Sequence, residues 1–356
     1  MKFPEKEKNH GYPACRPGIP FYLEWKKPAF IVFLLLPVPV FFVSIFLGTY
    51  PLSPLELLKV LLSHITAYEY SYPPIYDTVI FNSRFPRVLI AMMVGAALST
   101  SGATFQGIFR NPLVSPYILG LSSGAAFGAA LSIAVIPELP AQIGAFIFSL
   151  VALGFSYTMA RVGRQTSTVA LILSGVITSS VFGALLSIIQ YMTDEKAVQS
   201  IVYWTLGCLH TSCWSKFFDA FPLVLTGCLI IYLLRWKLNV LALGEEEAKA
   251  VGMNVELYKA IFIIAASLAA SAAVAVAGII GLLGLIVPHI LRMIFGPDHR
   301  KIIPLSITFG AAFLALVDDI ARSTFGFEIP VGIITTLLGA PFFLYLLRTT
   351  KIGGWE

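Results

Sequence analysis

The most concentrated group of reactive side chains in this sequence is acidic. Glu245, Glu246 and Glu247 stand together in the segment Leu241-Ala-Leu-Gly-Glu-Glu-Glu-Ala248, between apolar positions. This pattern suits a short amphipathic helix that lies against another protein, and a solvated loop with an acidic turn is the ordinary alternative. The chain has no Gly-x-x-x-x-Gly-Lys-Ser/Thr loop that could hold the phosphates of ATP. Energy for any work must therefore come from a partner.

Three arginines, Arg84, Arg87 and Arg322, lie in segments where few other basic residues occur. Guanidinium groups hold carboxylates in a fixed two-pronged geometry, so these arginines suit contact with an acidic partner. Snorkelling at the membrane surface, or pairing within the chain, is the alternative explanation. The acidic residues available for such pairing are Asp318, Asp319 and Glu328.

Thr166, Ser167 and Thr168 form a run of hydroxyl groups at the start of an apolar stretch. Ser and Thr at such a position ordinarily cap the helix that follows.

His289 and Arg292 lie three residues apart, which is about one turn of a helix. Structural hydrogen bonding explains this second pair better than ligand binding does. None of these groups predicts a catalytic site.

The four cysteines form no Cys-x-x-Cys pair, so the sequence indicates neither a structural zinc site nor a thioredoxin-like motif. Cys208 and Cys213 fall in one predicted outer loop. Buried free thiols are the plainest interpretation, with an external disulfide and a transient soft ligand as alternatives. We expect the chain itself to bind no metal.

These groups are set in a strongly apolar chain. Of its 356 residues, 57% are hydrophobic and 12% are charged, whereas soluble proteins carry about 25% charged residues. Apolar runs long enough to cross a bilayer as helices recur without a polar linker, and they do not alternate as β-barrel strands would. The sequence therefore predicts an all-α integral membrane protein with about ten spans. These are residues 28–48, 86–108, 117–136, 141–160, 168–190, 217–234, 257–277, 285–295, 302–320 and 331–347.

One transmembrane domain is predicted over residues 28–348, with polar tails at 1–27 and 349–356. A cleavable signal peptide would place its apolar core nearer Met1, so the first segment is interpreted as a tail before the first span. If the N-terminus is cytoplasmic, the inner segments hold 18 of the 24 Lys and Arg residues. Because basic residues concentrate on the cytoplasmic side, both termini are predicted to be cytoplasmic.

The segment 277–284, followed by Pro288, is apolar but poorly suited to a continuous helix. Broken backbone at membrane depth is tolerated where protein or a water-filled cavity surrounds it, so we expect a bend or a short re-entrant turn here. Small residues are dense in 95–102, which favours close helix packing. Gly-Ala-Ala-Phe at both 124–127 and 310–313 suggests an inverted internal repeat, although small-residue helices also produce such echoes by chance.

Several motifs, read together, resemble those of the FecCD-type permeases, the group that includes cobalamin, iron-siderophore and haem permeases. They occur in order from about residue 30 to residue 348. The motifs are Arg84-Phe-Pro-Arg87, Gly95-Ala-Ala-Leu-Ser-Thr-Ser-Gly102, Gln106, Arg110-Asn-Pro-Leu113, Leu241 to Ala248 with Val251-Gly252, Gly284-Leu-Ile-Val-Pro-His-Ile-Leu-Arg292, Asp318-Asp-Ile-Ala-Arg322, Glu328-Ile-Pro-Val-Gly332 and Gly339-Ala-Pro-Phe342. The resemblance implies a type II ABC importer fold in the cell (inner) membrane. It also implies a homodimer of permease subunits, two ATP-binding cassette subunits on the cytoplasmic side and an external substrate-binding protein.

The resemblance further implies roles for the groups described above. A coupling segment over residues 238–256 would dock into the ATP-binding subunit, which uses ATP and Mg while this chain binds no cofactor. Its docking residues are Leu243, Gly244, Glu245, Glu246, Glu247, Ala248 and Gly252. The arginines Arg84, Arg87 and Arg322 would meet acidic residues of the binding protein. A narrow hydroxyl-lined gate would be formed by Thr166, Ser167 and Thr168, with Gln106 and Asn111 in the same pathway.

The predicted function is the membrane-spanning permease of an ATP-driven importer for an iron chelate, either a ferric siderophore or haem. Cobalamin or another corrinoid, and an oxyanion, are the alternative cargoes. A secondary transporter is a rival class, but it normally needs an ionisable residue within a span, and Asp318 and Asp319 fall at a predicted outer end. A non-transporting membrane receptor is a second rival, which leaves the acidic segment unexplained. No nucleic-acid partner is expected.

Overall fold

The computed structural model describes residues 26–48, 50–65, 71–163, 165–324 and 328–349. Within them the regular secondary structure is helical, apart from the two-residue strands β1 (Arg161–Val162) and β2 (Gln165–Thr166), which pair antiparallel. The predicted tails lie almost wholly outside the described residues. The predicted fold class, an all-α membrane protein with about ten spans, is confirmed.

Apolar helical segments occupy the positions of all ten predicted spans. Those long and apolar enough to cross a bilayer are Lys27–Phe46, Ile75–Phe109, Ala141–Ala160, Thr168–Met192, Trp214–Leu243, Val255–Ala277 and His299–Ser323. The shorter ones are Leu121–Ala134, Leu283–Phe295 and Val331–Tyr345. Lipid offers no partner to a backbone N–H or C=O group, so helices, which satisfy these groups internally, are the expected form.

The first span consists of α2 (Lys26–Leu35) and α3 (Pro37–Phe46). The second begins at α5 (Ile75–Asp77), passes through the π-helix η1 (Thr78–Arg84) and continues as α6 (Phe85–Phe109). The remaining spans are α7 (Leu121–Ala134), α8 (Ala141–Ala160), α9 (Thr168–Met192), α11 (Trp214–Leu243), α13 (Val255–Ala277), α14 (Leu283–Phe295), α15 (His299–Ser323) and α16 (Val331–Thr349). Two short helices, α4 (Pro54–Ile65) and α10 (Glu195–Thr205), were not predicted, whereas α12 (Glu245–Ala250) lies in the predicted coupling segment.

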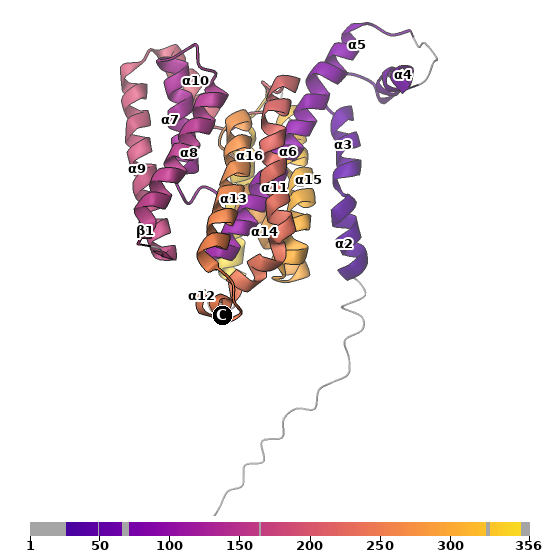
Figure 1. The fold of residues 1–356 in the computed structure, drawn as a ribbon. Helices are drawn as coiled ribbons and strands as arrows, with labels where there is room; N and C mark the ends of the chain where they lie inside the picture. The colour runs from indigo at the N-terminus through magenta and orange to yellow at the C-terminus, as the bar shows by residue number, and fades with distance from the viewer. Residues whose placement is uncertain (1–25, 49, 66–70, 164, 325–327, 350–356) are drawn as a thin grey trace, which may run out of the picture.

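Helix α6 is the centre of the molecule. The apolar window of its span is 89% buried, and α6 packs against α11, α13, α14 and α15. Figure 1 shows α7, α8, α9 and α10 together on one side of this bundle, with α2 and α3 on the other side. In the same view α12 lies at the end of the molecule opposite α5 and α10. We call these the α12 end and the α10 end.

Glycines allow α6 to lie close to its neighbours. A Cβ added at Gly102 would overlap the backbone carbonyl of Gly284 in α14, and one added at Gly95 would overlap the carbonyl of Gly310 in α15. Backbone atoms cannot rotate away from such an overlap as a flexible side chain can. The prediction that the small residues of 95–102 serve close helix packing is therefore confirmed.

The predicted bend between α13 and α14 is also confirmed. Helix α13 ends at Ala277, and Gly278 and Leu282 then take positive φ values of 70° and 61° before α14 begins. The N–H of Cys208, in the connection between α10 and α11, donates to the carbonyl of Ala277 at 2.9 Å. The connection between α10 and α11 therefore packs against the broken backbone, which is one of the conditions for such a break at membrane depth.

Candidate functional site

Helix α12 carries the predicted docking surface at the α12 end. It begins after Gly244, whose φ is 147°, and is followed by Gly252, whose φ is 79°, so a side chain at either glycine would strain the backbone. Leu243 and Val251 on either side of the helix are each 71% exposed, and the second and third glutamates of the acidic run are exposed between them. Ala248 is fully buried on the opposite side. The exposed side of α12 therefore combines apolar and acidic side chains.

Glu245, the first residue of α12, points into the protein instead. Its carboxylate accepts a hydrogen bond from Nζ of Lys259 in α13 at 2.5 Å. The same Nζ donates to the backbone carbonyl of Thr166 in β2 at 3.2 Å, and the carboxylate of Glu256 lies 4.0 Å away. The side chain of Lys259 is only 3% exposed. A buried ammonium group therefore joins α12 to the segment of hydroxyl residues, a connection that the sequence did not predict.

A cavity of about 440 Å³ lies where these elements meet. Its lining includes Thr166, Ser167 and Thr168, the predicted gate residues, together with Glu245 from the predicted coupling segment. The hydroxyl of Thr166 is buried without a hydrogen-bond partner among the described residues. Ser167 is the N-cap residue of α9, but its side chain makes no capping hydrogen bond. Capping therefore does not account for this hydroxyl run.

The two other predicted pathway residues do not reach this cavity. The side-chain nitrogen of Gln106 donates to two backbone carbonyls, one of them that of Gly284, at 3.3 Å, and its side-chain oxygen accepts a hydrogen bond from Arg292. This contact confirms the structural hydrogen bonding predicted for Arg292. Asn111 is exposed, and its side chain accepts a hydrogen bond from the N–H of Leu113 at 2.9 Å in the turn after α6.

At the α10 end, Arg87 in α6 pairs with two acidic residues. Its Nε and Nη2 donate to the carboxylate of Asp318 in α15 at 3.0 and 2.9 Å, and its Nη1 donates to Glu328 at 2.9 Å. The side chain of Asp318 is 1% exposed and that of Glu328 is 33% exposed. The pairing within the chain that was considered as the alternative role for Arg87 is therefore present.

Arg322 and Arg84 are buried as well. Arg322 donates to the carboxylate of Asp319 and to the backbone carbonyl of Ser44 in α3, both at 2.5 Å, and the Ser44 hydroxyl donates to Asp319 at 2.6 Å. Arg84 instead donates to three backbone carbonyls at and just beyond the end of α3. All three arginines that were predicted to dock a binding protein are thus bonded within the chain. Neither Ser44 nor the carbonyl contacts of Arg84 were predicted.

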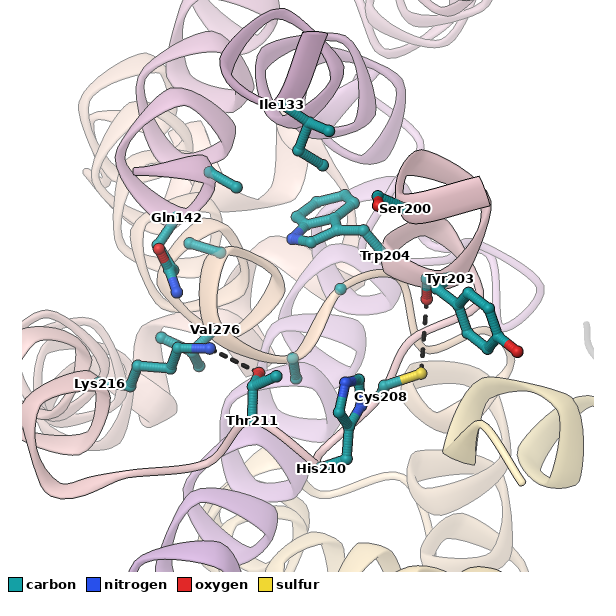
Figure 2. A pocket seen from close by; sticks show the side chains of 14 residues that line it. Ile133, Gln142, Ser200, Tyr203, Trp204, Cys208, His210, Thr211, Lys216 and Val276 are labelled. Carbon is teal, nitrogen blue, oxygen red and sulfur yellow. Dashed lines mark hydrogen bonds between the residues drawn. The ribbon is translucent and has the colours of Figure 1, made fainter. Parts of the chain in front are cut away.

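Two adjoining cavities, of about 320 and 400 Å³, lie at the α10 end and share Tyr203, Cys208 and His210. Figure 2 shows the first of them, with the amine of Lys216 donating to the hydroxyl of Thr211 at 2.6 Å on its wall. Broken backbone before α14 forms part of the same wall. These cavities lie at the opposite end of the molecule from α12 and from the hydroxyl run of Thr166, Ser167 and Thr168.

Cys208 and Cys213 are free thiols, as the simplest interpretation of the sequence predicts, but both are half-buried and not buried. Burial raises the pKa of the Cys208 thiol to about 11, although the nearby positive charge of Arg87 acts in the opposite direction. Over the part of the chain that the structure describes, no group of three or more His, Cys, Asp or Glu side chains could hold a metal ion.

Comparisons with known proteins agree over most of the chain. A model of the FecCD transport family matches residues 34–349. A molybdate import system permease protein of Haemophilus influenzae is 40% identical over 316 residues, which cover 88% of this chain and 93% of that protein. A permease of Helicobacter pylori, provisionally assigned to iron chelatin transport, is 40% identical over 276 residues, which cover 77% of this chain and 83% of that protein.

The fold also matches a solved structure of an ABC transporter of the proposed metal-chelate type in an inward-facing conformation, with a TM-score of 0.80 at 36% sequence identity. The superposition covers 91% of this chain and 100% of the other.

Proposed function

Because this chain belongs to the FecCD transport family, it is the membrane-spanning permease subunit of an ABC importer, and we propose that its cargo is an iron chelate, either a ferric siderophore or haem. It is a multi-pass protein of the cell membrane and is not itself an enzyme. Family membership excludes the two rival classes, a secondary transporter and a non-transporting receptor. The buried aspartates at 318 and 319 are paired with arginines, so they do not need to be explained as ion-coupling groups.

The observation that carries the transport role is the meeting of α12 with the hydroxyl run at one cavity. A permease that is driven by ATP hydrolysis in another subunit needs a surface that contacts this subunit. It also needs a structural route from that surface to the permease gate. The exposed surface of α12, with Leu243 and Val251 beside the acidic run, supports such a contact surface. The cavity lined by both Glu245 and Thr166 to Thr168 supports such a route.

The chemistry of α9 supports an iron chelate over a small oxyanion. The hydroxyl run leads directly into α9, and the 25 residues of this helix include no Asp, Glu, Lys, Arg or His. An oxyanion that moved along such a surface would lose hydration without gaining a cationic partner, which is energetically costly. A chelated ferric ion is enclosed by its organic ligand and loses less. The relative assigned to iron chelatin and the structure of metal-chelate type support the same class of cargo.

We propose three kinds of partner: a second copy of this permease, two ATP-binding cassette subunits and an external substrate-binding protein. The exposed side of α9 supports the second copy, because Val169, Leu173 and Val176 are each more than half exposed in the single chain. The charge bias of the sequence supports a cytoplasmic α12 end and cytoplasmic termini. The α10 end would then meet the binding protein, and the arginines buried there would have to exchange an internal partner for an acidic residue of that protein.

Uptake into proteoliposomes tests the cargo. The permease is reconstituted with its ATP-binding subunit and its binding protein, and labelled ferric siderophore, haem, cobalamin and molybdate are offered in separate assays. We expect a ferric siderophore or haem to accumulate only when ATP and the binding protein are both present. Accumulation of cobalamin or molybdate alone would contradict the proposed cargo while leaving the permease role intact.

A further inference from the structure

Lys259 occupies an unusual position for a lysine. It lies in the first turns of α13, yet its side chain is 3% exposed, whereas Lys249 on the neighbouring helix α12 is 47% exposed. A buried ammonium group loses the hydration of its charge and is stable only where other groups satisfy its donors. For Lys259 these groups are the Glu245 carboxylate at 2.5 Å and the Thr166 carbonyl at 3.2 Å.

The two partners of Lys259 belong to different functional segments. Glu245 opens α12, the helix whose exposed side is proposed to contact the ATP-binding subunit. Thr166 opens the hydroxyl run, and its own hydroxyl has no hydrogen-bond partner among the described residues. The hydroxyl run is therefore connected to α12 through the Thr166 backbone carbonyl and the Lys259 amine.

We propose that Lys259 is a positioning residue that transmits displacement of α12 to the Thr166–Thr168 segment, so that engagement of the ATP-binding subunit moves the gate. This inference rests on the proposed function. If α12 shifts, the carboxylate of Glu245 shifts with it. The Lys259 amine must then follow and pull on the Thr166 carbonyl, or remain behind as a buried charge without its closest partner. The second outcome is costly, so the two segments favour moving together.

The surroundings of Lys259 allow such movement. The cavity of about 440 Å³ borders both Glu245 and the hydroxyl run, so the run has open space on one side. Glu256 is also on the cavity wall, but its carboxylate lies 4.0 Å from Nζ, which is beyond hydrogen-bonding distance, so the Lys259 amine keeps Glu245 as its closest acidic partner.

Chemical labelling of the gate tests this role without reference to the cargo. Ser167 is exposed, and Ser167→Cys, in a background whose native cysteines are replaced, reports the accessibility of the run to a water-soluble maleimide. The complex with the ATP-binding subunit is labelled with and without trapped nucleotide. The labelling rate should change on trapping in the otherwise unaltered chain. Lys259→Met, which keeps the apolar stem and removes the charge, should reduce that change about tenfold, within the range of allosteric coupling.

A matched control is available on α15. Lys301 is exposed and lies outside the coupling segment, and Lys301→Met removes the same charge, so it should leave the nucleotide response unchanged. Glu245→Ala removes the carboxylate that pairs with Lys259. Because Glu245 is partly exposed, this variant tests the same contact if Lys259→Met fails to fold. The double variant, Lys259→Met with Glu245→Ala, should reduce the nucleotide response no more than either single variant does, because all three variants remove the same contact.

Two results would overturn the inference. A nucleotide response in Lys259→Met equal to that of Lys301→Met would show that Lys259 does not transmit movement, and it would leave the permease role untouched. Failure of the unaltered chain to copurify with an ATP-binding subunit would instead overturn the proposed function, and this inference with it.

Discussion

Arg87 of α6 and Asp318 of α15 form a buried two-pronged ion pair, although 231 residues separate them in the sequence. The guanidinium group of Arg87 also reaches Glu328, so one side chain holds α6, α15 and the segment before α16 together at the α10 end. Arginine suits this position because its planar group offers several donors in fixed directions. The pair therefore joins the central helix α6 to α15.

Arg87→Ala should destabilise the protein by about 3–5 kcal/mol, because it leaves the carboxylate of Asp318 buried without its closest partner. Unfolding of the purified protein in detergent measures the change. Arg300→Ala is the control, since Arg300 pairs with Asp298 at 3.2 Å while 66% exposed, and exposed pairs contribute less than about 1 kcal/mol. Equal stability of the two variants would contradict the structural importance of the Arg87 pair.

Glu328→Gln should strengthen association with the binding protein. Glu328 is the more exposed of the two carboxylates on Arg87, and its removal frees part of the guanidinium group for an external acidic residue. The gain should shrink as salt is added, because exposed charges are screened. Titration of the binding protein onto the permease at two ionic strengths measures both effects. Unchanged or weaker association at low salt would count against a docking role for Arg87.

Gly102→Ala should destabilise the bundle by about 1–3 kcal/mol, because the added methyl group overlaps the Gly284 carbonyl and must force α6 and α14 apart. Gly183→Ala in α9 is a matched control, since no atom lies within 4 Å of a Cβ added there. Alanine favours a helix over glycine by about 1 kcal/mol, so this control should be neutral or stabilising. Thermal unfolding of both variants compares them, and equal transition temperatures would argue against close packing at Gly102.

The rate of Cys208 alkylation should keep increasing with pH up to unusually alkaline values. Burial raises the pKa of its thiol to about 11, whereas an unperturbed thiol has a pKa of about 8.5. Only the thiolate reacts, so the rate should rise about tenfold per pH unit and keep rising at about pH 10. Iodoacetamide labelling of a variant that retains Cys208 alone measures this. A plateau near pH 9 would mean that the thiol is more hydrated than the structure indicates.

The spans could be predicted from the sequence because lipid selects for long apolar helices, and each predicted span coincides with a helix. The bend at Gly278 was predictable for a related reason, since a run rich in glycine favours no continuous helix. Helices α4 and α10 were missed. Each is short and amphipathic, and neither resembles a membrane span.

Partners of buried charged groups were harder to predict than the helices. Arg87 and Arg322 could be assigned either to an external partner or to the nearby acidic residues, and only three-dimensional packing shows that Asp318, Asp319 and Glu328 reach them. Lys259 was counted merely as one of the basic residues of the inner side. A lysine at the third position of the predicted span 257–277 is a signal for a buried partner, but the sequence alone does not place the carbonyl of Thr166 beside it.

The most direct measurement is the sidedness of α12. A variant with Glu247→Cys as its sole cysteine is treated, in intact cells and in inside-out vesicles, with a thiol reagent that cannot cross the membrane. The account predicts labelling only in inside-out vesicles, and protection from labelling when the ATP-binding subunit is bound. Labelling of Glu247→Cys in intact cells would place α12 on the outer side and contradict the account.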